Sequence, residues 1–162
     1  MELCILVLAN PGSNVLIPKP GFPLYKTLCG GPGINIKQYN LKVEQNWKID
    51  IDHLESLIDS KTAAIIYNNP SNPCGSVYSE DHIEEVLRIA EKYRIPIIAD
   101  EIYEDTIFSE SKFFSIASLT REVPVLSCSG ISKSFLLLGY RCGWIIIHDR
   151  HERLGFSVSV SS

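Results

Sequence analysis

Short apolar segments recur along the chain, and stretches with a helical spacing of apolar residues lie between them. Residues 62–68 (TAAIIYN) and 95–100 (IPIIAD) are typical of buried strands, whereas residues 80–93 repeat apolar positions every three or four residues. Strands that alternate with helices predict an α/β fold, with a largely parallel sheet flanked by helices. The expected strands are 14–18, 34–39, 62–68, 95–100, 123–127 and 142–148.

The same pattern places the helices. Residues 80–93 follow Ser79, a suitable N-cap, and begin with two acidic residues that suit the positive end of a helix dipole. A second helix is expected over residues 52–58. The opening MELCILVL is interpreted as the end of a buried helix, because a signal peptide would have a basic leader. The apolar face of the longer helix consists of Ile83, Val86, Leu87 and Ala90.

Polar residues close three of the expected strands. These residues are Asn68, Asp100 and Ser127, and the segments that follow them are NNPSNPCG, EIY and CSGISK. Ligands of open α/β sheets bind beyond the carboxyl ends of the strands. The three segments are therefore predicted to meet at one edge of the sheet and to form a site there.

Several long segments resemble the class I aminotransferases of fold type I, and within that family the tyrosine aminotransferases. The likeness covers nearly all the chain up to about Gly155, and ordered motifs of this length are far more specific than a single short pattern. The matching segments are LANPGSNVLIPKPGFPLYKTL (8–28), NNPSNPCGSVYS (68–79), IPIIADEIYED (95–105), GISKSF (130–135) and GYRCGWIIIHDR (139–150).

The resemblance implies pyridoxal 5′-phosphate as the cofactor and gives three residues catalytic roles. Lys133 corresponds to the lysine that forms the Schiff base and moves the proton between Cα and the cofactor. Asp100 would pair with the pyridinium nitrogen, and Tyr103 would donate a hydrogen bond to the phenolic oxygen of the ring. Taken alone, Lys133 would be interpreted as a solvated surface lysine and Asp100 as a helix N-cap.

Four further residues are implied to bind the cofactor. Asn72 would also contact the phenolic oxygen, and the bond from Asn72 to Pro73 is a candidate cis peptide. Arg141 would bind the phosphate, although an ion pair with a neighbouring carboxylate is the alternative. Phe22 would stack on the ring, unless it belongs to the core. Gly130 stands where the family usually has a phosphate-binding serine, so Ser127, Ser129 or Ser132, or else backbone N–H groups, would bind the phosphate in its place, and Ser132 is the expected ligand.

The resemblance also implies the reaction and the domain organisation. The reaction is amino-group transfer from an aromatic amino acid, with L-tyrosine as the expected donor, to 2-oxoglutarate. Residues 1–154 would be part of the large domain of a homodimer and residues 155–162 a divergent tail, while the family's small domain and phosphate loop lie outside the chain. Two alternatives remain, namely a catalytically incomplete fragment that acts only by associating with a complete subunit, and a related fold type I lyase.

Composition changes this picture little. The 162 residues are 45% hydrophobic and 21% charged, with a net charge of -4, which gives no reason to expect nucleic acid or a membrane as a partner. Five cysteines without a CxxC pair favour reduced, buried thiols and a cytoplasmic location. The segment from His148 to His151 lacks a third convergent ligand, so a solvated helix start is expected there and not a metal site.

Overall fold

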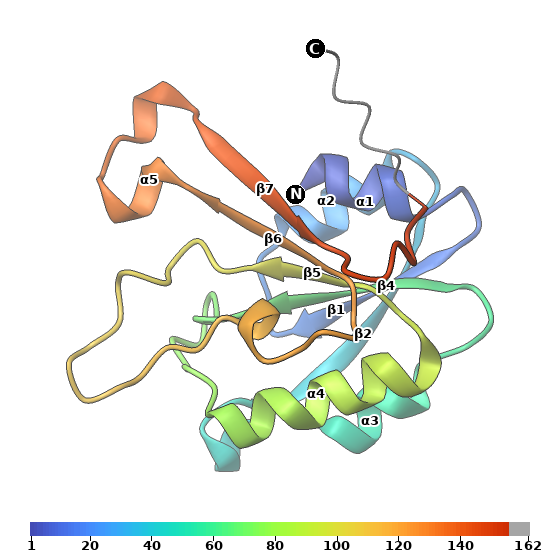
Figure 1. Ribbon diagram of the computed structural model, residues 1–162, viewed down its shortest axis with the longest axis horizontal. Coiled ribbons are helices and arrows are strands. Elements are labelled where there is room, and N and C mark those ends of the chain that lie inside the picture. Colours follow the sequence, from blue (N-terminus) through green and yellow to red (C-terminus); the bar gives the residue numbers. More distant parts are fainter. Residues whose placement is uncertain (156–162) are drawn as a thin grey trace.

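Seven strands form one sheet in the order β3-β2-β1-β4-β5-β6-β7 in the computed structural model, which describes residues 1–155 (Figure 1). β3 pairs antiparallel with β2, β7 pairs antiparallel with β6, and the other neighbours are parallel. The predicted, largely parallel sheet is confirmed. The strands are β1 Asn14–Lys19, β2 Asn35–Lys42, β3 Lys48–Ile49, β4 Thr62–Asn68, β5 Ile97–Asp100, β6 Val125–Gly130 and β7 Gly143–His148.

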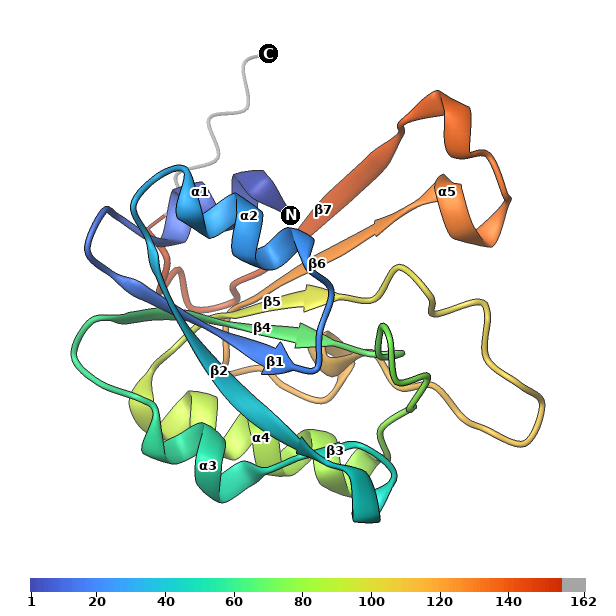
Figure 2. The same cartoon turned by 180° about the vertical axis from the view of Figure 1, so that it is seen from behind.

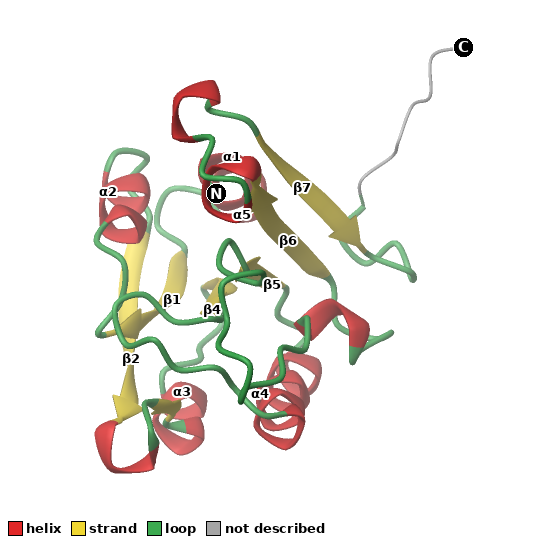
Figure 3. Ribbon diagram, turned by 90° about the vertical axis from the view of Figure 1, so that its left-hand side faces the viewer, coloured by secondary structure: helices red, strands yellow, loops and turns green. Residues whose placement is uncertain are grey.

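Helices cover both faces of the sheet. Figure 3 shows α1 and α2 on one side and α3 and α4 on the other. Among residues 1–155, no helix is long and apolar enough to cross a membrane. The α-helices are α1 Glu2–Leu8, α2 Leu24–Gly30, α3 Ile51–Ser56, α4 Glu80–Tyr93 and α5 Ile131–Ser134, and the short 3-10 turns are η1 Val43–Gln45, η2 Ile116–Ser118 and η3 Leu138–Tyr140.

The central strands are apolar throughout because both of their faces are buried. On β4, Ala64 and Ile66 belong to the core beneath α1 and α2, whereas Ile65 and Tyr67 belong to the core against α3 and α4. All four side chains are fully buried. Successive side chains of a strand point to opposite faces, so a strand covered on both sides cannot alternate apolar and polar residues.

α4 spans the residues that the sequence predicts. The fully buried Ile83 and Val86 lie on the face that packs against the sheet. The predicted N-cap differs in detail, because the Ser79 side chain forms no capping hydrogen bond and its carbonyl accepts from the Ile83 N–H instead. Arg94 caps the end of the helix, and its φ of 55° lies in the left-handed region.

Three details of the sequence prediction are corrected. β6 does not end at Ser127 but continues to Gly130, because β7 folds back on it and extends the ladder to that residue. α1 is buried on one face only, since the side chains of residues 3, 6 and 7 are exposed. The segment after His148 is a turn and not a helix start, and the Asp149 carboxylate accepts from the backbone N–H groups of residues 153 and 154.

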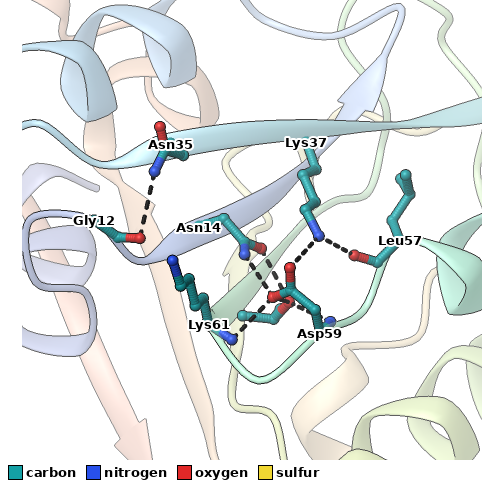
Figure 4. A network of polar contacts seen from close by, with 8 residues as sticks. Gly12, Asn14, Asn35, Lys37, Leu57, Asp59 and Lys61 are labelled. Carbon is teal, nitrogen blue, oxygen red and sulfur yellow. Dashed lines mark hydrogen bonds and ion pairs between the residues drawn. The ribbon is translucent and has the colours of Figure 1, made fainter.

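A polar network ties the amino ends of β1 and β4 to the turn after α3, on the side of the sheet opposite the predicted site. The Asp59 carboxylate accepts hydrogen bonds from Lys37 Nζ at 2.7 Å and Asn14 Nδ2 at 2.8 Å (Figure 4). It also accepts from the Lys61 N–H at 2.9 Å. These donors, Lys37 first, hold the pKa of Asp59 well below its usual range. The network holds the strands in register at the end of the sheet opposite the predicted site.

Candidate active site

The seven residues implied by the resemblance line a single cavity of about 480 Å³. The cavity lies at the carboxyl ends of β4, β5 and β6, the edge of the sheet that faces the viewer in Figure 3. The prediction that the three segments meet at one edge of the sheet is therefore confirmed. The residues are Phe22, Asn72, Asp100, Tyr103, Ser132, Lys133 and Arg141.

The side chains reach the cavity from several elements. Asp100 is the last residue of β5, and Tyr103 lies in the turn that follows. Lys133 lies on the one-turn helix α5, directly after β6. Asn72 comes from the loop after β4, and Phe22 comes from the loop between β1 and α2. Parallel strands thus deliver residues that are far apart in sequence to one edge.

Asp100 is the most constrained polar group of the cavity. Burial raises the pKa of its carboxyl above the usual value, and hydrogen bonds from Tyr25 and the Ile102 N–H oppose that rise only in part. Among residues 1–155, no lysine, arginine or histidine forms an ion pair with Asp100. A half-buried carboxylate of this kind is suited to pair with a cation that enters the cavity.

Tyr25 is a site residue that the sequence reasoning missed. Its hydroxyl donates to Asp100 Oδ2 at 2.7 Å, and its ring packs edge-on against Phe22 at a centroid distance of 5.8 Å. Burial, and then the nearby Asp100 charge, raise the pKa of Tyr25, so the phenol keeps its proton and is the donor. The only sequence signal is the position of Tyr25, three residues after Phe22 and in the first turn of α2.

Replacing Tyr25 with phenylalanine is expected to weaken pyridoxal phosphate binding by about 10- to 150-fold, because a hydrogen bond to a charged group is worth ~1.5–3 kcal/mol. Without the donor, the pKa of Asp100 rises further and the carboxylate is a poorer partner for a cation. A fluorescence titration with the cofactor measures the change. Tyr39→Phe is the matched control, since the buried Tyr39 hydroxyl donates to the Ile66 carbonyl, away from the cavity. Equal losses of affinity in both variants would contradict the role of Tyr25.

Lys133 lies beside Tyr103 at the mouth of the cavity. The Lys133 Nζ atom is 5.5 Å from the centroid of the Tyr103 ring, within the range of a cation–π contact. Among the described residues, Lys133 Nζ forms no ion pair with a carboxylate. The amine therefore remains available to react with a carbonyl carbon.

Asn68 connects the loop after β4 to the end of β5. Its side-chain amide donates to the Asp100 carbonyl at 3.1 Å, and its Oδ1 atom accepts from the Asn72 N–H at 2.7 Å. This bridge holds Asn72 at the cavity. The peptide bond from Asn72 to Pro73 is cis, as the sequence suggested, and so is the bond from Asn69 to Pro70.

The other end of the cavity is built by α5 and η3. Arg141 has a left-handed φ of 50, and its Nη1 atom donates to the Leu138 carbonyl at 3.2 Å. The alternative of an ion pair is not realised, because no carboxylate of residues 1–155 lies within 4.0 Å of the Arg141 guanidinium. The guanidinium therefore has free donors for an anion.

Gly130 fits tightly against β7. A Cβ atom at this position would lie 2.9 Å from the Cys142 carbonyl oxygen and 3.1 Å from Gly143 Cα. Three serines were expected to bind the phosphate in place of Gly130. Of these, Ser127 does not line the cavity, and Ser129 donates to Glu104 Oε1 at 2.9 Å. Ser132 lines the cavity, and its hydroxyl donates to no other group among residues 1–155.

A buried carboxyl group fixes the loop that carries Tyr103. Glu101 is 3% exposed and accepts hydrogen bonds from Ser115 Oγ at 2.8 Å and from the Ile116 N–H at 2.9 Å. These contacts close the loop between β5 and η2. Burial raises the pKa of Glu101 from 4.5 to about 7. The sequence reasoning did not single out this residue.

The free energy of unfolding is expected to decrease by about 3 kcal/mol as the pH rises from 4.5 to about 7, because the folded chain keeps the Glu101 proton and the unfolded chain loses it. Glu101→Gln should remove this decrease, since an amide can donate to Ser115 and accept from the Ile116 N–H at every pH. Urea unfolding at several pH values between 4.5 and 7 measures it. The exposed Glu110→Gln variant should keep the slope, and a slope unchanged by Glu101→Gln would contradict the assignment.

A larger hollow of about 880 Å³ lies elsewhere and is not the candidate site. It includes Pro96 and Pro124, which precede β5 and β6, and therefore lies at the amino ends of these strands. Two of its cations already have partners, since Arg153 pairs with Glu122 and Lys92 with Glu55. The carboxyl edge of the sheet has the reactive set of side chains.

Comparison with known proteins agrees with this geometry. A family model described as aminotransferase class I and II matches residues 1–157. Tyrosine aminotransferase from Bos taurus is 56% identical over 155 residues, which are 96% of this chain and 35% of that protein. An S-alkyl-thiohydroximate lyase from Arabidopsis thaliana is 40% identical over 149 residues, 92% of this chain and 32% of that protein.

The fold has the same relatives. The crystal structure of tyrosine aminotransferase from Leishmania infantum superposes with a TM-score of 0.92 at 35% identity and covers 95% of this chain and 42% of that one. This chain spans about a third of the length of the curated relatives it matches. Enzymes of the matching family use pyridoxal 5′-phosphate as cofactor. On the sequence match and the shared fold together, the chain belongs to the aminotransferase class I and II family.

Proposed function

We propose that this chain carries the cofactor site of a pyridoxal-phosphate-dependent transaminase. The reaction is amino-group transfer from an aromatic amino acid, with L-tyrosine as the preferred donor, to 2-oxoglutarate. One observation carries the proposal: the half-buried Asp100 carboxylate, which forms no ion pair among residues 1–155, lies in the same cavity as the available Lys133 amine. Residues 1–154 would supply part of the large domain of a homodimeric enzyme.

The chemistry of the donor set fits pyridoxal phosphate. Lys133 would hold the aldehyde carbon covalently, and Asp100 would pair with the protonated ring nitrogen. Tyr103 and Asn72 would donate to the phenolic oxygen. The free donors of Arg141 and Ser132 would bind the phosphate. Phe22, which is 37% exposed at the wall of the cavity and contacts the Tyr25 ring edge-on, would lie against one face of the cofactor ring.

The residues of the cavity have separate roles in the proposed reaction. The cofactor, when bound, supplies an electron sink for the carbanion that forms at the substrate Cα atom. The Lys133 amine would remove the proton from the substrate Cα and return it at the cofactor's C4′ carbon, which would make it the general base and acid of the reaction. Asp100 would keep the ring nitrogen protonated, and the hydrogen bond from Tyr25 orients the Asp100 carboxylate and favours its ionised form.

A single labelling experiment tests the cofactor site. The purified chain is mixed with pyridoxal phosphate, its absorbance spectrum is recorded, and the product is reduced with borohydride and mapped by peptide mass spectrometry. Labelling confined to Lys133 is expected, although the chain has nine lysines in total. Labelling spread over surface lysines would overturn the proposal. Formation of a 2-oxo acid from L-tyrosine then tests the donor.

A lyase that uses the same cofactor is the second candidate, because one relative of this family is a lyase at 40% identity. The two reactions have distinct products. A transaminase converts the bound cofactor to its amine form when a single amino acid is added, whereas a lyase releases a fragment of the substrate and leaves the aldehyde form. Absorbance of the cofactor after addition of L-tyrosine alone distinguishes them.

A third candidate is a fragment that acts by associating with a longer subunit of the same family. Exposed apolar side chains favour it, among them Leu136, which is 78% exposed, and Tyr140, which is 76% exposed. Co-expression with a tagged longer relative tests this candidate, and failure of the two chains to co-purify would exclude it.

For each of these functions we place the chain in the cytoplasm, because all five cysteines are free thiols.

A further inference from the structure

Two buried thiols face each other between α1 and β6. The Cys4 and Cys128 sulfur atoms are 3.4 Å apart, although 124 positions separate the residues in the sequence. Cys4 is 0% exposed and Cys128 is 8% exposed. Among residues 1–155, no other two thiols are in hydrogen-bond contact; Cys29 is buried, Cys74 is half-buried and Cys142 is exposed.

We propose that Cys4 and Cys128 form a redox pair, a site of reversible oxidation at which hydrogen peroxide converts the two thiols to a disulfide. The site is distinct from the proposed cofactor chemistry and does not depend on it. The access of peroxide to the two thiols, their reactivity, and the short shift of α1 that would close the bond support this site.

The cavity at the sheet edge gives an oxidant access to the pair. Cys128 lines this cavity, and Cys4 lines a second hollow of about 220 Å³ on the other side of the pair, so a molecule as small as peroxide can approach both residues. A hydrogen bond from the Cys128 S–H lowers the pKa of Cys4, because it stabilises the Cys4 thiolate. A thiolate beside a protonated thiol is the arrangement that reacts with peroxide and is then resolved to a disulfide.

The reaction balances with one molecule of peroxide. A sulfur atom of the pair attacks one peroxide oxygen, the O–O bond breaks, and the departing hydroxide takes up a proton to become water. The second sulfur then attacks the resulting S–OH sulfur, and the oxygen leaves as a second water with the remaining thiol proton. Two S–H bonds and one O–O bond are lost, one S–S bond and two waters are formed, and sulfur is oxidised while peroxide is reduced.

Little movement is needed to close the bond. A disulfide is about 2.05 Å long, so the sulfur atoms have to approach by about 1.4 Å. Cys4 lies on α1, a helix of seven residues that is packed on one face only and exposes Leu3, Leu6 and Val7 on the other. A short helix at the surface can shift by that distance more easily than a central strand can.

The bond would act close to the candidate active site. Cys128 on β6 is the register partner of Asp100 on β5. A disulfide to Cys128 would tie α1 to the strand beside Asp100. Oxidation is therefore expected to alter the wall of the cavity as well as the thiols.

Peptide mapping of the whole chain tests the pair. The reduced protein is treated with hydrogen peroxide under native conditions, free thiols are blocked, and the digest is analysed without reduction. A cross-linked peptide with Cys4 and Cys128 is expected in about tenfold excess over any pair that includes Cys29, because proximity governs exchange between thiols. Pairs dominated by the exposed Cys142, or Cys128 recovered unmodified at full oxidation of Cys142, would overturn the proposal.

Variants give the control. Cys29→Ser removes a buried thiol without a partner and should leave the cross-link unchanged. Cys4→Ser should abolish it and leave Cys128 singly oxidised or free. The wild-type map remains decisive if Cys4→Ser fails to fold. Since the assay uses no cofactor and no turnover, its failure would leave the proposed function untouched, and failure of the labelling at Lys133 would leave the redox pair untouched.

Discussion

Alanine in place of Lys133 is expected to abolish covalent capture of pyridoxal phosphate and to lower transamination by at least ~10²–10⁴-fold, the range that a general base contributes. The other residues of the cavity would still bind the cofactor non-covalently, so the protein should take it up with lower affinity. Borohydride should then attach no cofactor to the chain. Absorbance, peptide mass and 2-oxo acid formation each measure one part of this expectation.

The fold should not change in this variant. Lys133 is partly exposed on α5 and its amine forms no ion pair among residues 1–155, so its removal creates neither a core cavity nor an unpaired buried charge. Lys112→Ala is the matched control, since Lys112 is exposed in the loop after β5 and its amine lies 4.5 Å from the centroid of the Phe114 ring. If Lys133→Ala still carried a reducible cofactor at another lysine with unchanged activity, Lys133 would not be the reactive amine.

The sheet and the convergence of the site were accessible from sequence because they depend on local patterns. Both faces of β4 are covered, so its apolar run is continuous, and its predicted bounds agree with the structure. α4 is equally clear, since its apolar spacing and its acidic first turn agree. Parallel strands then bring the residues after each strand to one edge, which is why Asn72, Asp100 and Lys133 were expected together.

Features that depend on pairing across the sheet were not accessible. The extension of β6 past Ser127 is caused by β7, and the ladder between Gly130 and Gly143 cannot be read from either segment alone. The contact from Tyr25 to Asp100 joins residues 75 positions apart. The contact between Cys4 and Cys128 joins residues 124 positions apart. Composition and periodicity have no information on contacts of this range.

Asparagine in place of Asp100 is expected to weaken pyridoxal phosphate binding by about 30- to 1,000-fold, because loss of one partner from a buried charge pair costs ~2–4 kcal/mol. The amide has almost the shape of the carboxylate, and its oxygen can still accept from the Tyr25 hydroxyl. It cannot neutralise a protonated ring nitrogen. The cofactor nitrogen would lose its proton, so the proton transfer by Lys133 should slow together with the loss of affinity.

The stability of the cofactor-free chain should change in the opposite direction. Burial raises the pKa of Asp100 in the folded chain, so the folded state prefers the protonated carboxyl, and stability that is present below the usual value of 3.8 is lost as the pH rises through the raised pKa. Asparagine is neutral at every pH and avoids that loss. At neutral pH, Asp100→Asn should therefore unfold at a urea concentration equal to or above that of the wild type.

Two measurements on the same samples decide between a cofactor role and a structural role for Asp100. A residue that served the fold alone would lower stability and affinity together when replaced, whereas a ligand of the ring nitrogen would lower affinity and leave stability intact or higher. Asp105→Asn, five positions along in an exposed turn, controls for the loss of one negative charge and should change neither value. An Asp100→Asn chain that loses stability and affinity together would show that the carboxylate supports the sheet edge and is not a ligand of the cofactor.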